Sequence, residues 1–186
     1  MKRSMCILML CLVGMMSQAW GQHKALTPKE TARITALEYK HFQHVKTYLC
    51  SDMESVKAGD VVKVGLLFQI AEGWNIYDND TLAHGYLPTQ VQWIVPDGCH
   101  VVGVVWQTPV KLFENESKMG YFHYCFVVVT IRVEKAPATA FEVKTEYEWQ
   151  MCDDRQCIHR KGSSSIPLKV GTSKRTGLYG MLKKWK

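Results

Sequence analysis

Beyond its first sixteen residues the sequence has no long hydrophobic run. No later segment approaches the about 18 uncharged apolar residues that a membrane-spanning helix needs. Internal repeats and low-complexity stretches are also lacking. Hydrophobic residues make up 47% of the chain and charged residues 22%, which is the balance of a globular protein and excludes wholesale disorder. With 186 residues, the chain is expected to form one domain.

A large excess of charge of one sign is also missing. The chain has 23 lysines and arginines against 17 acidic residues. This excess is too small for the basic surface of a nucleic-acid-binding protein, so we expect no nucleic-acid partner. The basic residues concentrate in a tail, residues 171–186, which contains no acid. Such a tail is either a solvated, disordered end or a weak contact with an anionic membrane surface.

The first 21 residues have the pattern of a secretory signal peptide. Lys2 and Arg3 form the charged start, residues 6–16 form the apolar stretch, and residues 19–21 form a small-x-small cleavage site. We therefore expect a mature chain that begins at Gln22 and is exported to a compartment that tolerates disulfides. An uncleaved membrane anchor is the alternative.

Cysteine is sparse. Beyond the predicted signal peptide there are five cysteines, which are Cys50, Cys99, Cys125, Cys152 and Cys157. Because this number is odd, at least one thiol stays free or pairs outside the chain. Five cysteines are too few for a small fold built on disulfides, so a disulfide here is expected to serve chemistry rather than scaffolding.

Most of the chain alternates apolar and polar residues with a period of two, which is typical of strands. In residues 140–150, for example, Phe141, Val143, Tyr147 and Trp149 share one face, and glutamates and a lysine share the other. Seven segments read as strands, namely residues 62–70, 74–77, 91–95, 101–106, 121–133, 140–150 and 166–170. The pattern predicts an all-β protein, an immunoglobulin-like antiparallel β-sandwich, with a closed barrel as the alternative.

A helix is indicated only near the amino terminus. Thr27, Pro28 and Glu30 form a capping box with proline at the first helical position, and the helix is expected to run to about Phe42. We therefore divide the chain into a signal peptide (1–21), an amino-terminal extension with a short helix (22–44), the sandwich (45–170) and the basic tail (171–186).

Cys152 and Cys157 are separated by only four residues. In an extended chain they would stand about 16 Å apart, beyond the roughly 4.4–6.8 Å between the Cα atoms of a disulfide. A disulfide therefore requires a tight turn, for which Asp153 and Asp154 are suited. Because the bridge closes only a small loop, it adds only about 2 kcal/mol to the free energy of unfolding. Stabilising the fold is therefore a poor reason for it. A passive staple nevertheless remains an alternative.

The charges around the two sulfurs differ. Two carboxylates follow Cys152, whereas Arg155 and His159 lie near Cys157 and favour its thiolate. Cys157 is therefore expected to be the more reactive sulfur. Metal binding is another alternative, because Cys152, Cys157 and His159 are soft ligands, with His123 and Cys125 as more distant candidates. The four-residue gap is looser than the usual metal-binding knuckle.

Four motifs occur together in one order. They are Gly73-Trp74-Asn75-Ile76-Tyr77, Leu87-Pro88-Thr89, residues 106–113, and Glu148-Trp149-Gln150-Met151-Cys152-Asp153-Asp154-Arg155-Gln156-Cys157. With them the chain resembles, over about residues 45–170, the amino-terminal periplasmic domain of the thiol:disulfide interchange protein DsbD. The resemblance implies a sandwich in the periplasm of a Gram-negative bacterium. Its cysteine pair would pass reducing equivalents from a thioredoxin-like domain to disulfide isomerases and other thiol proteins, without a cofactor.

The resemblance also implies roles for single residues. Cys157 matches the cysteine that forms mixed disulfides, Phe113 matches an aromatic residue of a cap loop that shields the pair, and Tyr77 matches an aromatic residue near the site. Three departures stand out. Ile158-His159-Arg160 replaces the prolines of many relatives, Cys50, Cys99 and Cys125 lie outside the pattern, and the transmembrane and thioredoxin-like domains are missing from the sequence. We therefore expect either that another polypeptide is the electron donor or that the role of the protein has changed. A non-redox binding module and a periplasmic metal-binding protein are the rival functions.

Overall fold

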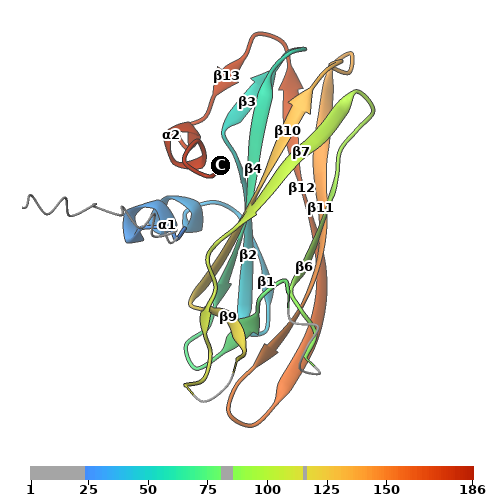
Figure 1. Ribbon diagram of the computed structural model, residues 1–186. Coiled ribbons are helices and arrows are strands. Elements are labelled where there is room, and N and C mark those ends of the chain that lie inside the picture. Colours follow the sequence, from blue (N-terminus) through green and yellow to red (C-terminus); the bar gives the residue numbers. More distant parts are fainter. Residues whose placement is uncertain (1–23, 81–85, 115–116) are drawn as a thin grey trace, which may run out of the picture.

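The computed structural model describes residues 24–80, 86–114 and 117–186. Two β-sheets pack face to face, and two short helices lie against the outer face of one of them (Figure 1). The predicted signal peptide and its cleavage site lie outside the described residues. No helix in the described part of the chain is long and apolar enough to cross a membrane.

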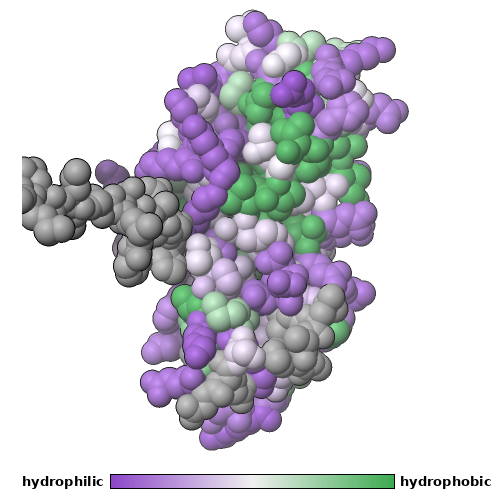
Figure 2. Space-filling model, in the orientation of Figure 1, coloured by the Kyte–Doolittle hydropathy of each residue, from purple (hydrophilic) through white to green (hydrophobic). Residues whose placement is uncertain are grey.

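The first sheet has five strands, and all its pairings are antiparallel. In spatial order they are β1 (Tyr39–Phe42), β2 (Val45–Ser51), β4 (Val61–Ile70), β10 (Tyr124–Val133) and β7 (Cys99–Trp106). The edge strand β7 exposes the apolar side chains of Val101, Val102 and Val104. A hydrophobic area lies over β7 in the upper half of Figure 2.

The second sheet is built around a long hairpin of β11 (Ala140–Cys152) and β12 (Cys157–Val170). On the side of β12 lie β3 (Met53–Val56) and β13 (Lys174–Arg175), and β3 makes the single parallel pairing among the described strands. On the side of β11 lie β6 (Gln90–Ile94), β5 (Asn75–Tyr77), β9 (Met119–Phe122) and β8 (Val110–Lys111).

The core lies between the sheets and is rich in aromatic rings. Phe68 of β4 meets Tyr147 and Trp149 of β11 edge-on, with ring centroids 5.5 and 5.6 Å apart. Burial of such a side chain contributes about 1.5–3 kcal/mol. The alternation predicted for residues 140–150 is confirmed, because the apolar side chains face this core and the glutamates face outward. The predicted β-sandwich is therefore confirmed.

Two predicted elements differ in extent. The helix α1 (Pro28–Thr35) begins at the predicted capping box but ends at Thr35, and the residues expected to continue it form β1. Phe42 explains the difference, because in a strand its ring packs edge-on against Tyr147 and Trp149 of the core. The predicted strand over residues 121–133 is divided by His123, whose φ of 61° turns the chain from β9 in one sheet to β10 in the other.

The basic tail is folded. A short helix, α2 (Tyr179–Leu182), and the residues after it pack with α1 on the outer face of the first sheet. Met181, Leu182 and Trp185 are buried there, and the Trp185 ring lies 4.9 Å from that of Phe126. The disordered alternative is therefore wrong, because three apolar side chains among the lysines supply enough buried surface to order the segment.

Candidate functional site

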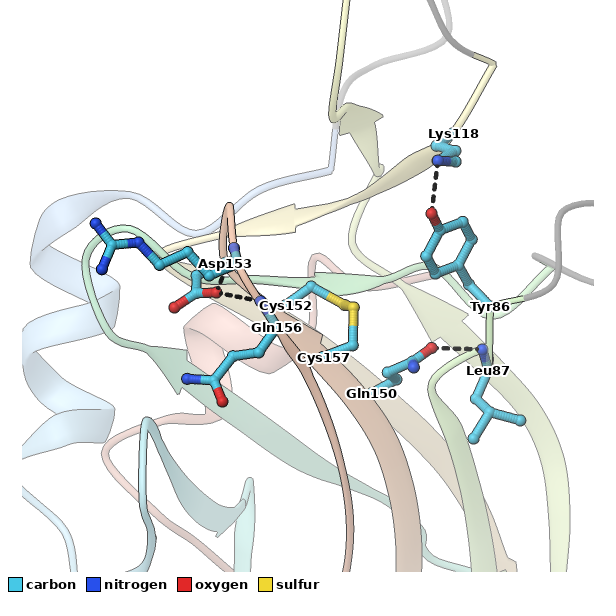
Figure 3. The surroundings of a disulfide bond; sticks show 9 residues. Tyr86, Leu87, Lys118, Gln150, Cys152, Asp153, Gln156 and Cys157 are labelled. Carbon is cyan, nitrogen blue, oxygen red and sulfur yellow. Dashed lines mark hydrogen bonds between the residues drawn. A yellow bond between two sulfur atoms is a disulfide. The ribbon is translucent and has the colours of Figure 1, made fainter.

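Cys152 and Cys157 form a disulfide at the end of the β11–β12 hairpin (Figure 3). They face each other across the two strands, with Cα atoms 4.1 Å apart. The predicted aspartate turn joins them. The Asp153 carboxylate accepts hydrogen bonds from the backbone N–H groups of Arg155 and Gln156 at 2.9 and 2.8 Å. This geometry confirms the tight hairpin expected from the spacing.

The two sulfur-bearing residues differ in exposure. Cys152 is 3% exposed, whereas Cys157 is open to solvent. Cys152 is buried in a small apolar cluster with Tyr77 and Leu112, against which Tyr86 packs. A reagent or partner from solution therefore meets Cys157 first.

Four interactions hold Tyr86 and the residue after it in place, and the two hydrogen bonds among them are drawn in Figure 3. The Tyr86 ring stacks on Tyr77 with centroids 4.5 Å apart. Lys118 donates a hydrogen bond to the Tyr86 hydroxyl at 2.9 Å, and its ammonium lies 4.2 Å from the ring centroid. The backbone N–H of Leu87 donates to Gln150 Oε1 at 2.9 Å. Together these contacts fix a cover over the Cys152 side of the disulfide.

Sequence reasoning missed Tyr86, Leu112 and Gln150. Tyr86 and Gln150 border or lie within the motifs of residues 87–89 and 148–157, but nothing in those motifs indicates that the two segments touch. Their contact depends on the pairing of β6 with β11, which brings Leu87 beside β11.

The aromatic residues expected to shield the pair are placed differently. Tyr77 is 2% exposed and lies in the cluster with Cys152. Phe113 is 46% exposed and lies outside that buried cluster, and its neighbour Leu112 enters the cluster instead. The Lys118 ammonium is 5.6 Å from the Phe113 ring centroid. A shielding role for Phe113 stays a prediction.

The cations expected to favour the Cys157 thiolate have acidic partners. Arg155 lies 3.8 Å from Asp154 and is largely exposed. His159 Nε2 lies 3.5 Å from Glu148 Oε2, which also binds the Lys161 ammonium at 2.8 Å. The hydrogen bond from Lys161 lowers the pKa of the Glu148 carboxyl, which keeps it ionised. The charge around Cys157 is therefore more balanced than the sequence suggests.

The other three cysteines of the described residues, Cys50, Cys99 and Cys125, are free and buried. Burial raises the pKa of Cys50 to about 12 and raises that of Cys125 as well, so both stay protonated at neutral pH. Burial also raises the pKa of Cys99. These three thiols are therefore shielded from solvent. Among the cysteines of the described residues, only the hairpin disulfide has a sulfur-bearing residue that solvent or a partner can reach.

Of the residues proposed for the alternative metal site, Cys152, Cys157 and His159 lie at one end of the hairpin, where the two cysteines are bonded to each other, but the distant candidates are not brought to them. Cys125 lies in the core between the sheets, and His123 is exposed at the break before β10. Within the described ranges, no three or more histidine, cysteine or acidic side chains are grouped so that they could hold a metal ion.

Comparison with known proteins gives a family and a fold. Residues 46–167 match the family described as thiol:disulfide interchange protein DsbD, N-terminal. The N-terminal periplasmic domain of ScsB from Proteus mirabilis is similar in structure, with a TM-score of 0.55 and 16% identity over 79% of this chain and 57% of that one. The reduced N-terminal domain of DsbD from Neisseria meningitidis matches with a TM-score of 0.38 and 15% identity over 71% and 89% of the two chains. A comparison with curated proteins finds no match. The structural match covers a little more than half of the length of the ScsB domain.

Proposed function

The chain belongs to the DsbD N-terminal domain family, and on that basis we propose that it passes electrons between thiol proteins through the Cys152–Cys157 disulfide. One observation carries the proposal. The disulfide lies at the tip of a hairpin with Cys157 open to solvent and Cys152 covered, which is the arrangement that exchange with a large partner requires. A staple that only held the hairpin together would gain nothing from an exposed sulfur.

Reduction of the pair takes two exchange steps. A thiolate of the donor attacks Cys157 Sγ, so that a mixed disulfide forms, the Cys152–Cys157 bond breaks, and Cys152 leaves as a thiolate that takes a proton from water. A second donor thiolate then attacks the donor sulfur of the mixed disulfide and releases the Cys157 thiolate. The donor dithiol is oxidised to a disulfide, and the pair gains two electrons.

Delivery to an acceptor follows the same path in reverse. The Cys157 thiolate attacks the acceptor disulfide and forms a mixed disulfide, while the released acceptor thiolate is protonated. Cys152 then attacks Cys157, re-forms the hairpin disulfide and frees the second acceptor thiol. Because Cys152 needs to reach only its own neighbour, its cover does not hinder this step, and the same cover protects it from other oxidants.

The family suggests the partners. The donor is a thioredoxin-like protein or domain, and the acceptors are disulfide isomerases or other exported thiol proteins. The exchange needs no cofactor, since both electrons move with the sulfur–sulfur bond. We place the reaction in the periplasm, which is consistent with the signal-like start of the sequence and with the periplasmic origin of the similar ScsB domain.

The test is exchange with a protein dithiol. The oxidised protein is mixed with reduced thioredoxin, quenched with acid, alkylated and weighed by mass spectrometry, and we expect reduction of Cys152 and Cys157 within seconds to minutes. The Cys157→Ser variant is the control. Resistance of the native disulfide to thioredoxin, together with normal folding, would leave the binding-module rival. Stoichiometric uptake of Zn²⁺ by the reduced pair would favour the metal-binding rival.

A further inference from the structure

Within the described ranges, one edge of β12 has no neighbouring strand along most of its length. On the side away from β11, the adjacent strand β3 pairs with β12 only at Lys169 and Val170. From Cys157 to Leu168 the described chain places no strand on that edge. Exposed strand edges offer backbone hydrogen-bonding groups to other chains. This open edge begins at the exposed sulfur of the disulfide.

The register of the hairpin shows which backbone groups point to the open edge. In an antiparallel pair, positions with Cα atoms near 4.5 Å are those whose N–H and C=O groups point away from each other. The 4.1 Å between Cys152 and Cys157 identifies them as such a pair, next to the hydrogen bond from Asp153 N–H to the Gln156 carbonyl. The backbone of Cys157 therefore points away from β11, and so does that of every second residue after it, including His159 and Lys161.

Two observations farther along β12 agree that every second residue from Cys157 points its backbone groups away from β11. The carbonyl of Ser163 accepts a hydrogen bond from the side chain of Lys40, which is possible because that carbonyl points away from β11. Pro167 also occupies an outward position, and a proline is tolerated there because no N–H is needed for the β11 ladder. Proline at an outward position of β12 is thus compatible with the hairpin.

The line of attack on the disulfide leads to the same edge. The sulfur–sulfur bond joins β11 to β12, and a thiolate that displaces Cys152 approaches Cys157 Sγ roughly in line with that bond. This approach comes from beyond β12, on the side of the open edge. The attacking cysteine of a protein partner therefore brings its own backbone alongside Cys157, His159 and Lys161.

We propose that the β12 edge from Cys157 to Lys161 is the docking site for an extended segment of the partner that lies beside its reacting cysteine, and that this segment adds to the sheet as an extra strand. The inference rests on the proposed exchange function. Backbone hydrogen bonds in such a mode give affinity with little dependence on sequence. That suits a protein that serves more than one thiol partner. The β7 edge of the other sheet is also open among the described residues, but its exposed side chains are His100 and three valines, and it carries no disulfide.

The first experiment removes one outward N–H. His159→Pro deletes that donor without breaking a ladder bond to β11, and His159→Ala is the matched control because both variants lose the imidazole. We expect thioredoxin to reduce the proline variant roughly three to ten times more slowly than the alanine variant. This is the factor expected when about one backbone hydrogen bond to the partner is lost. Glutathione is too small to add a strand to the sheet, so the rate at which it reduces the disulfide should be equal in the two variants. Equal rates with thioredoxin, or an equally large loss with glutathione, would overturn the docking site.

If the proline variant does not fold, a second measurement tests whether the partner adds a strand to the β12 edge. Mixed disulfides of the Cys152→Ser protein are prepared with a single-cysteine thioredoxin and with glutathione, and amide hydrogen exchange is compared by NMR. The amides of Cys157, His159 and Lys161 should be protected only in the thioredoxin adduct, whereas Ile158, already in the β11 ladder, should not change. No added protection would overturn the strand addition while leaving exchange intact. Failure of the wild-type disulfide to react with thioredoxin would instead reject the exchange function and the docking site together. Protection without thioredoxin at high protein concentration would assign the edge to a second copy of this chain.

Discussion

Gln150 Oε1 accepts a hydrogen bond from the backbone N–H of Leu87 at 2.9 Å, and so ties the segment before β6 to the strand that carries Cys152. The residue before this contact, Tyr86, stacks on Tyr77 in the cluster that buries Cys152. The amide side chain of Gln150 thereby connects the strand of the disulfide to the cover of its less exposed sulfur.

Loss of this hydrogen bond should loosen the cover. In the reduced protein, Gln150→Ala is expected to increase the alkylation rate of Cys152 several-fold, because Leu87 and Tyr86 lose one of their attachments. Gln92→Ala is the control, since Gln92 is exposed on β6 and its side chain makes no hydrogen bond that belongs to the cover. Iodoacetamide labelling followed by peptide mass spectrometry measures both rates. Equal rates in the two variants would show that the cover does not depend on Gln150.

Leu112 and Phe113 should differ in how strongly they shield the cysteine pair. Leu112→Ala should speed oxidation and alkylation of the reduced pair, because it opens the cluster around Cys152. Phe113→Ala should speed them less, since the Phe113 side chain is 46% exposed. Side-by-side alkylation of the two variants, with circular dichroism to verify the fold, measures the order. A larger effect of Phe113→Ala would restore the cap role that the family resemblance implies.

The two cysteines should differ in their ability to hold a partner. Cys152→Ser leaves Cys157 exposed and removes this chain's resolving sulfur, so a stable adduct is expected with a thioredoxin that retains only its attacking cysteine and is activated as a mixed disulfide with a small thiol, which leaves when Cys157 attacks. Cys157→Ser should trap little, because Cys152 lies under its cover. Non-reducing electrophoresis after incubation of each variant with this activated single-cysteine thioredoxin shows the adducts. Trapping mainly in the Cys157→Ser protein would reverse the assignment of roles.

The carboxy-terminal segment should stabilise the fold. Trp185 is 5% exposed and packs on Phe126, so Trp185→Ala is expected to lower the free energy of unfolding by about 3 kcal/mol or more. Lys183→Ala, a change at an exposed lysine of the same segment, should lower it by less than about 0.5 kcal/mol. Urea unfolding followed by tryptophan fluorescence or circular dichroism measures both. A negligible effect of Trp185→Ala would mean that the segment contributes little to stability.

Stability should fall at alkaline pH in part through Cys50. Its pKa in the folded protein is raised from 9.0 to about 12, mainly because burial disfavours the thiolate. Since the unfolded chain ionises first, the stability that this thiol contributes is complete below pH 9 and is lost as the pH rises toward 12. The Cys50→Ala protein should therefore lose less stability between pH 8 and pH 11 than the wild type does, as measured by urea unfolding. Parallel losses in the two proteins would show that Cys50 does not cause the decline.

Local features of the chain were open to prediction because each is encoded within a few neighbouring residues. The alternation in residues 140–150 specifies a strand with one buried face, and Asp153 specifies the turn that joins Cys152 to Cys157. The capping box of α1 is equally local. The end of α1 was not predicted, because the strand formed by Tyr39–Phe42 depends on a distant partner in the core.

The sequence by itself thus determined a β-sandwich and a hairpin disulfide, since side-chain period and turn chemistry act over a few residues. Only the tertiary structure decided which sulfur is covered, because Tyr77, Tyr86 and Leu112 reach Cys152 from segments 40 to 75 residues away. It also decided that Glu148 pairs with His159 and Lys161, and that the β12 edge beside Cys157 stays open. Exposure, charge pairing and free strand edges are properties of surfaces that distant segments build together, and no local pattern specifies them.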